Sequence, residues 1–150
     1  MSTTIDLLSE QHQEVLAHLA KTEEALGADA RGNAAAALAE YLHHDVVQHF
    51  AIEEEALFPI MGRHLGYDHG PLAVMNAEHA DFRRLLEGLT RGVETGDVEQ
   101  QRENAHGLID LLRGHIAKED QVLFPMAARL LGPEELGEVD QRAAALRAAS

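Results

Sequence analysis

Apolar residues recur three, four and seven positions apart along most of this 150-residue chain. This spacing repeats one face of an α-helix, and no stretch alternates apolar and polar residues as a half-buried strand does. The pattern predicts four long helices and a shorter fifth one, over residues 4–26, 34–61, 72–93, 98–131 and 133–148. Val74 and Val122 are among the apolar positions that the pattern assigns to buried helix faces.

Glycine and proline separate the predicted helices, because both favour helix ends and turns. The breaks lie at residues 27–33, 62–71, 92–97 and 132–133. Pro59 and Pro125 lie inside two predicted helices, and each is expected to kink or end its helix because it lacks a backbone N–H. Amphipathic helices joined by short loops are typical of an up-down-up-down four-helix bundle. We therefore predict an all-α fold, with a bundle domain over residues 1–132 and a C-terminal helical extension over 133–150.

The composition narrows the class of protein. Lys and Arg total 12 against 26 Asp and Glu, so the net charge is −14. Such an acidic chain is not expected to bind nucleic acid or an anionic membrane surface. The absence of cysteine excludes disulfides, thiolate metal ligands and cysteine-held iron–sulfur clusters. No apolar run approaches the ~18 residues of a membrane span, and the N-terminus lacks the features of a signal peptide, so we expect a cytoplasmic protein.

Two stretches of the chain nearly repeat, and both contain histidine. His49-x-x-x-Glu53 and His115-x-x-x-Glu119 lie 66 residues apart, and both continue into Leu-Phe-Pro. Residues four apart on a helix lie about 40° apart on one face, so each His–Glu pair can point the same way. A further histidine precedes each pair on the helix before it, and these two lie 67 residues apart. The chain therefore reads as two copies of one helical hairpin.

Four imidazoles and two carboxylates are thus expected to converge inside the bundle. They are His12, His49, Glu53, His79, His115 and Glu119. This set has too few oxygens for calcium, whereas imidazole suits zinc, iron, copper or nickel. A single zinc ion needs only four ligands, so six donors favour a dinuclear site in which each carboxylate bridges two ions. Flanking apolar residues predict that the site is dry.

The doubled His-x-x-x-Glu stretch, with His12 and His79 before it, resembles the hemerythrin-like (HHE cation-binding) family over nearly the whole chain. The resemblance implies a bundle that holds a non-haem di-iron centre: two iron ions joined by an oxo or hydroxo bridge. It also implies that the partner is a small molecule, namely dioxygen, nitric oxide or peroxide. Oxygen-carrying members have His-x-x-x-His where this sequence has Met75 before His79, and His-x-x-x-x-Asp where it has Glu119, with Asp120 at the fifth position.

These departures disfavour reversible oxygen carriage and favour sensing, metal handling, or peroxide or nitric oxide chemistry. Family members with this ligand set that repair iron–sulfur clusters carry a cysteine-bearing N-terminal segment, so that role is not expected of this cysteine-free sequence. Ferritin-like iron storage is rejected because its ligand order and spacing differ. Two alternatives stay open: an enzyme that consumes peroxide or nitric oxide at the same centre, and a helical interaction module that binds metal adventitiously.

The remaining polar residues are expected to have other roles. Six histidines are expected at the surface: His18, His43, His44, His64, His69 and His106. The sequence assigns Glu54, Glu55 and Asp120 to a solvated face, with Glu54 or Asp120 as an alternative ligand. Tyr41 and Asp45 are candidates for hydrogen bonds to the ligands or for completing the coordination of an ion. Met75, Phe58 and Phe124 are expected to pack in the core.

Overall fold

The computed structural model describes residues 3–28 and 33–149, and within these ranges the protein has helices and no strand, which confirms the all-α prediction. The helices form four long rods. The first rod is α1 (Thr3–Ala28). The second rod consists of five segments joined end to end: α2 (Asn33–Tyr41), η1 (Leu42–Val46), α3 (Val47–Ile52), η2 (Glu53–Leu57) and α4 (Phe58–Leu65). The third rod is α5 (Pro71–Thr95). The fourth rod consists of three segments joined end to end: α6 (Val98–Lys118), η3 (Glu119–Leu123) and α7 (Phe124–Leu130). The last helix is α8 (Pro133–Ala149).

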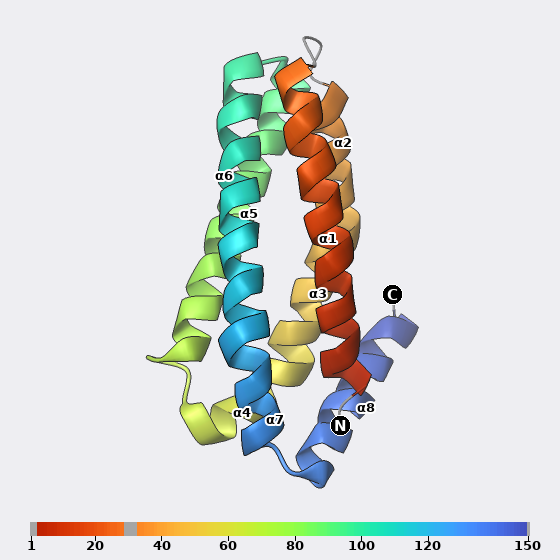
Figure 1. Cartoon of the computed structure of the whole chain (residues 1–150), viewed down its shortest axis with the longest axis vertical. Helices are drawn as coiled ribbons and strands as arrows, with labels where there is room; N and C mark the ends of the chain where they lie inside the picture. The colour runs from red at the N-terminus through yellow and green to blue at the C-terminus, as the bar shows by residue number, and fades with distance from the viewer. Residues whose placement is uncertain (1–2, 29–32, 150) are drawn as a thin grey trace.

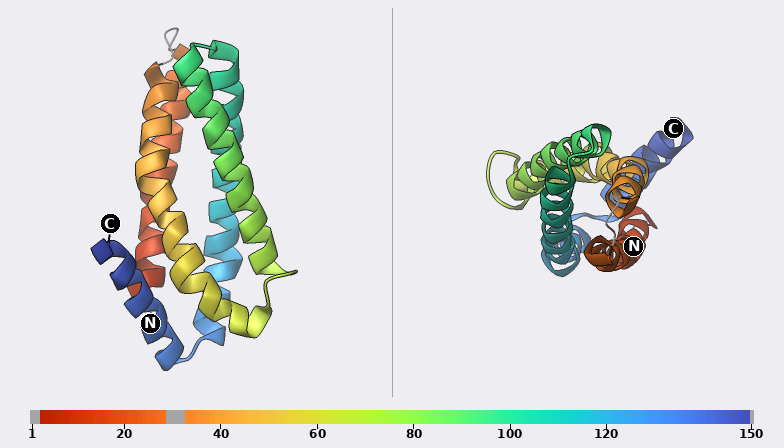
Figure 2. Two further views of the ribbon diagram at one scale, coloured as in Figure 1. Left: turned by 180° about the vertical axis from the view of Figure 1, so that it is seen from behind. Right: turned by 90° about the horizontal axis from the view of Figure 1, so that it is seen from above.

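The rods lie side by side around a common axis, and successive rods run in opposite directions (Figure 1; Figure 2). Most of the predicted break at 27–33 falls on residues 29–32, which are outside the described ranges. The break at 92–97 is a tight turn in which Gly96 has a φ of 73°, and Asp97 caps α6 by accepting a hydrogen bond from the backbone N–H of Gln100. Helix α8 crosses the base of the bundle, where Val139 and Ala143 are buried.

Two of the rods contain a π-helical turn that ends two residues before a proline. Pro59 and Pro125 were expected to kink or end their helices, and neither ends its helix, since the helical path continues through both. A proline ring presses on the carbonyl of the residue four positions earlier, and the wider π turn gives it room. Segments η2 and η3 begin at Glu53 and Glu119, so the two predicted carboxylate ligands start the two irregular turns.

The apolar core has two clusters with a polar layer between them. One cluster lies toward the end where α5 meets α6 and includes Leu38, Leu89 and Leu108. The other lies at the base and includes Leu8 and Ile60, together with residues of α8. The predicted metal ligands lie along each rod between members of the two clusters, so apolar layers enclose them on both sides.

The apolar periodicity is wrong at three positions, one of which is Leu130 of the predicted helix over residues 98–131, which is 37% exposed. Val74 is 45% exposed and Val122 is 50% exposed. Val122 lies in the π turn η3, where the extra residue rotates the chain so that Leu123 is buried instead. Val74 precedes the buried Met75, and neighbouring residues on a helix point about 100° apart.

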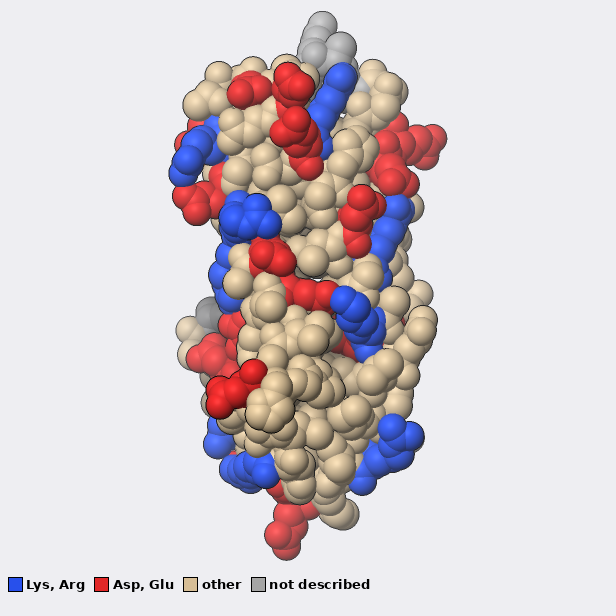
Figure 3. Space-filling view, turned by 90° about the vertical axis from the view of Figure 1, so that its left-hand side faces the viewer, with Lys and Arg blue, Asp and Glu red and all other residues tan. Residues whose placement is uncertain are grey.

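The surface of the bundle is charged, and it holds the six histidines that were expected there. On the α5 side, Asp and Glu side chains are spread along the molecule with Lys and Arg between them (Figure 3). Among the described residues, none of the helices is both long enough and apolar enough to span a membrane.

Candidate metal centre

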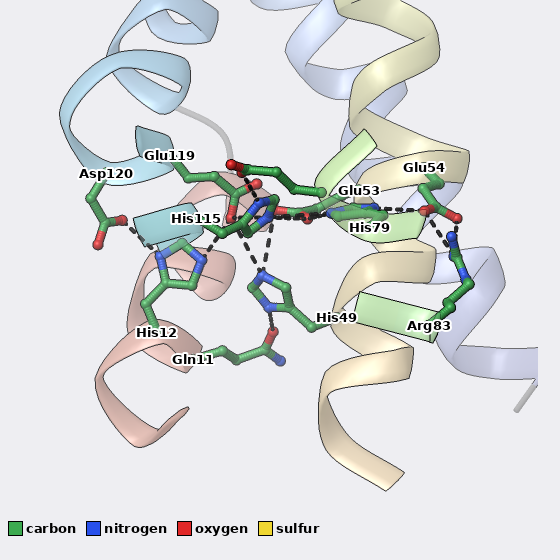
Figure 4. Close-up of polar contacts among 11 residues, drawn as sticks. Gln11, His12, His49, Glu53, Glu54, His79, Arg83, His115, Glu119 and Asp120 are labelled. Atoms are coloured by element: carbon green, nitrogen blue, oxygen red, sulfur yellow. Dashed lines mark hydrogen bonds and ion pairs between the residues drawn. The ribbon is translucent and has the colours of Figure 1, made fainter. Parts of the chain in front are cut away.

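The six predicted ligands meet at the centre of the bundle (Figure 4). Each of the four rods contributes: α1 carries one histidine, α3 with η2 a histidine and a glutamate, α5 one histidine, and α6 with η3 a histidine and a glutamate. At most 5% of each residue is exposed. The tertiary structure therefore brings the whole predicted set together in a buried layer.

The Nε2 atom of every histidine in the set faces the carboxylates. His12 Nε2 lies 2.9 Å from Glu119 Oε1, and His79 Nε2 lies 3.0 Å from Glu53 Oε1. Both contacts cross between the two hairpins of the repeat. His49 Nε2 lies 3.4 Å from Glu53 Oε2 on its own rod. At these separations, the six inward-facing donors lie close enough together to surround one small internal site.

The donors divide into two overlapping groups. In the first group, one potential ligand atom from each residue lies within 4.8 Å of the others, and the group consists of His12, His49, Glu53 and Glu119. The second group meets the same limit and consists of Glu53, His79 and His115. Glu53 belongs to both groups, as a bridging carboxylate would. His79 Nε2 and His115 Nε2 face each other at 3.3 Å, which suits two nitrogens that share a cation better than a neutral pair.

Each of the four histidines uses its outer nitrogen for a hydrogen bond to a side-chain oxygen. The Nδ1 donors and their acceptors are His12 to Asp120 at 2.8 Å, His49 to Gln11 at 2.8 Å, His79 to Glu54 at 2.6 Å and His115 to Glu78 at 2.9 Å. An oxygen acceptor requires the proton on Nδ1, so in the neutral ring the Nε2 lone pair is directed inward. Metal-binding histidines are held by such outer partners.

These outer acceptors correct one prediction. Glu54 and Asp120 do not belong to a solvated face, since both are partly buried and bind histidines; Glu55 is exposed as expected. The signal was present in the repeat. Glu54 and Asp120 recur at the 66-residue spacing of the glutamates they follow, and Gln11 and Glu78 at the 67-residue spacing of the histidines they precede.

Cations at the surface support two of the outer carboxylates. Burial raises the pKa of Glu54, but Arg83 and His79 lower it below its usual value. In the same way, burial raises the pKa of Glu78, and Lys118 and His115 lower it. Both groups are therefore ionised acceptors at neutral pH.

The inner carboxylates are left short of partners. Both oxygens of Glu53 and Oε2 of Glu119 are buried and form no hydrogen bond within the described residues. Burial lowers the pKa of a histidine, but these carboxylates more than offset it and raise the pKa of His49 to about 9 and that of His115 to about 10. Burial raises the pKa of Glu53, but His49 and its other neighbours hold it well below its usual range. A buried anion without full compensation is costly, so the residues fit a bound cation.

Aromatic rings form the walls of the centre. Phe50 stacks on His79 with ring centroids 3.7 Å apart, and Phe124 stacks on His12 at 5.4 Å. Phe58 is also buried against His79, so the expected core role of Phe58 and Phe124 is confirmed. These rings restrict imidazole rotation and surround the polar site with apolar groups.

The other candidate ligands do not reach the site. Asp45 accepts a hydrogen bond from His44 at 2.7 Å, and Tyr41 stacks on His18. Met75 packs in the lower apolar cluster, as expected. Asp45 contributes to neither donor group among the described residues.

The helical fold and the buried histidine–carboxylate cluster define a class of metal-binding helical proteins. The family model described as hemerythrin HHE cation binding domain matches residues 3–127, and the chain belongs to this family.

Curated relatives are similar in sequence to part of this chain. The iron-sulfur cluster repair protein YtfE of Enterobacter sp. (strain 638) is 34% identical over 102 residues, which cover 60% of this chain and 46% of the relative. The YtfE protein of Citrobacter koseri is 35% identical over 104 residues, with the same coverage of each chain. The chain thus spans less than half the length of these relatives. No solved structure matches it closely enough to count as similar.

Proposed function

We propose that this protein is a non-haem di-iron protein that binds or senses dioxygen, nitric oxide or peroxide. The proposed metal ligands are His12, His49, Glu53, His79, His115 and Glu119. The observation that carries the proposal is the pairing of four inward Nε2 atoms, each fixed by an outer hydrogen bond, with buried carboxylate oxygens that lack partners. The proposed unit is an up-down-up-down four-helix bundle over residues 1–132, with 133–150 as an extension.

The chain's own residues prepare the centre for this role. The bound irons would supply a redox-active site that takes a small diatomic or peroxide ligand. Gln11, Glu54, Glu78 and Asp120 orient the imidazoles, and Phe50 with its neighbours excludes bulk water. A dry site with oriented ligands favours small molecules over water as the exogenous ligand.

The test is metal analysis and absorption spectroscopy of protein purified without oxygen, before and after exposure to air. We expect about two irons per chain, as a dinuclear site requires, and new near-ultraviolet charge-transfer bands in air. Glu53→Ala and Glu119→Ala should lose the metal. His43→Ala is the matched control, because His43 is an exposed histidine on the same rod.

A colourless protein that binds zinc or no metal after iron reconstitution would overturn the proposal. The chain would then be better described as a helical interaction module. Steady-state consumption of hydrogen peroxide or nitric oxide, faster than the same concentration of free iron achieves, would identify the enzymatic form of the proposal.

A second candidate function is the repair of iron–sulfur clusters, which the names of the curated relatives state for those proteins. The identity over 60% of this chain supports it. In that role the protein would deliver iron to a cluster-free acceptor, which would supply the cysteines, since this sequence has none. Cluster assembly on the acceptor with sulfide, faster with the iron-loaded protein than with free ferrous ion, would favour repair. Nitric oxide binding without iron release would favour sensing.

A further inference from the structure

A cavity of about 210 Å³ opens on the side of the bundle between α1 and the rod that contains η1 and α3. Its inner wall includes His49, a proposed ligand that is only 5% exposed, and Gln11, the hydrogen-bond acceptor of His49. Glu14, Tyr41 and Asp45 line it further out. The cavity therefore extends from the surface to His49 and to Gln11, the partner of the outer nitrogen of His49.

The internal repeat explains why this half of the molecule is open. Gln11 and Val15 line the cavity, and the equivalent positions 67 residues later hold Glu78 and Phe82. Phe82 is larger than valine and is almost fully buried, edge-on to Phe50. Glu78 forms an ion pair with Lys118, which occupies the position equivalent to Ile52 in the cavity wall. In the second half of the repeat, the ring of Phe82 and the Glu78–Lys118 ion pair thus occupy the positions that line the cavity in the first half.

The cavity has an acidic lining. It contains the carboxylates of Glu14 and Asp45, the guanidinium of Arg147 from α8, and His44, whose Nδ1 lies 2.7 Å from Asp45 Oδ1. Burial raises the pKa of Tyr41 to about 12, and Asp45 and Glu14 add to the effect, so both carboxylates act on the same small space. A cleft lined by one sign of charge concentrates ions of the opposite sign, and the chain as a whole carries −14.

We propose that this cavity is the route by which divalent metal ions reach the centre, with Gln11 and His49 as its inner end. The inference rests on the proposed metal centre. Cations gain from the two carboxylates, whereas a neutral diatomic molecule gains nothing from them and an anion is repelled. The side-chain oxygens of Asp45, Glu14 and Gln11 offer successive hard contacts for a divalent ion.

The test places a large side chain at the mouth of the cavity. Gln48 is exposed and lines the cavity, whereas the neighbouring Val47 is exposed and lines a different one. The probe is Co²⁺ added to the metal-free protein, with uptake followed by stopped-flow absorbance. Gln48→Trp should slow loading roughly tenfold or more without changing the final cobalt content, because loading would then require local opening of the bundle. Val47→Trp should load at the unsubstituted rate.

A second variant copies the closed half of the repeat. Val15→Phe installs the residue found at position 82, and it should slow loading in the same way. The double variant Glu14→Gln/Asp45→Asn should load roughly tenfold more slowly at low salt, with a smaller difference at high salt, because salt screens steering.

The outcomes separate this inference from the proposed function. An unsubstituted protein that takes up no metal refutes the proposed centre itself. Loading at the unsubstituted rate by Gln48→Trp and Val15→Phe overturns the route alone. The route is also wrong if Gln48→Trp slows nitric oxide binding to the iron-loaded protein while cobalt loading stays unchanged, since the cavity would then serve the small ligand.

Discussion

The outer hydrogen bonds of the four histidines differ in one respect, and this difference can be measured. Three acceptors are carboxylates, and the fourth is the amide of Gln11. Glu78, the counterpart of Gln11 in the repeat, accepts from His115 at 2.9 Å. Replacing Glu78 by glutamine makes the two halves alike and removes one anionic acceptor from the centre.

The expected size of the effect follows from the strength of the bond. A hydrogen bond to a charged group contributes about 1.5–3 kcal/mol and a neutral one about 1 kcal/mol. The loss of about 0.5–2 kcal/mol corresponds to a factor of about 2–30 in an equilibrium constant. If the proposed centre holds two ions, Glu78→Gln should therefore weaken the binding of one ion by about this factor and leave that of the other nearly unchanged. Competition with a chelator, titrated against each variant, measures both dissociation constants.

Two variants test the reasoning behind this number. Lys118→Gln removes the ion pair of Glu78 but keeps its bond to His115, and an exposed pair contributes at most about 1 kcal/mol. If Lys118→Gln reproduces the whole loss, the hydrogen bond is not the cause. Gln11→Glu is the reciprocal change and should strengthen the other ion. An unchanged or weaker affinity in Gln11→Glu, or no loss in Glu78→Gln, would refute the role of acceptor charge.

Three further predictions concern the stability of the metal-free protein. Phe50→Ala removes a buried ring stacked on His79, so it should cost roughly 3–5 kcal/mol in a denaturant melt, and a cost below 1 kcal/mol would contradict the stacking. Burial lowers the pKa values of His49 and His115, but the nearby carboxylates outweigh burial and raise them to about 9 and about 10. Their stabilising contribution should be complete below the ordinary value of 6.5 and be lost as the pH rises through 9 and 10, so a melting temperature that rises over that range would be inconsistent. Gly96→Ala should cost about 1–2 kcal/mol because Gly96 has a φ of 73°, and equal unfolding free energies would show that the turn relaxes.

The helices were predictable because apolar spacing reports burial directly. The helix predicted over residues 72–93 corresponds to α5 (Pro71–Thr95), and the one predicted over 133–148 corresponds to α8 (Pro133–Ala149). Their ends differ by at most two residues. The periodicity fails at Val122 because it assumes 3.6 residues per turn, and the π turn η3 has more. A proline three residues later was the available sign of that irregularity, since its ring requires a wider turn.

The inner donors were predictable and most of their outer partners were not. His49 and Glu53 share a face of one helix, so spacing along the chain is enough to pair them. The bond from His12 to Asp120 joins the first rod to the last, and spacing does not tell which rods are neighbours. An acidic residue also follows each of the two glutamates in the repeat, and these are Glu54 and Asp120. Their role as hydrogen-bond acceptors of the histidines is evident only from the tertiary contacts.

Contacts between the candidate metal ligands join the two hairpins in the middle of the molecule, and these contacts have a kinetic consequence. His12 Nε2 contacts Glu119 Oε1, a residue 107 positions away, and His79 Nε2 contacts Glu53 Oε1 on the other hairpin. A chain that has formed only one hairpin therefore offers an ion an incomplete set of donors. A metal ion should add little to the folding transition state and much to the folded protein, so it should slow unfolding without accelerating folding. The supply of metal would then determine how long each folded molecule lasts, while the polypeptide alone determines how quickly it forms.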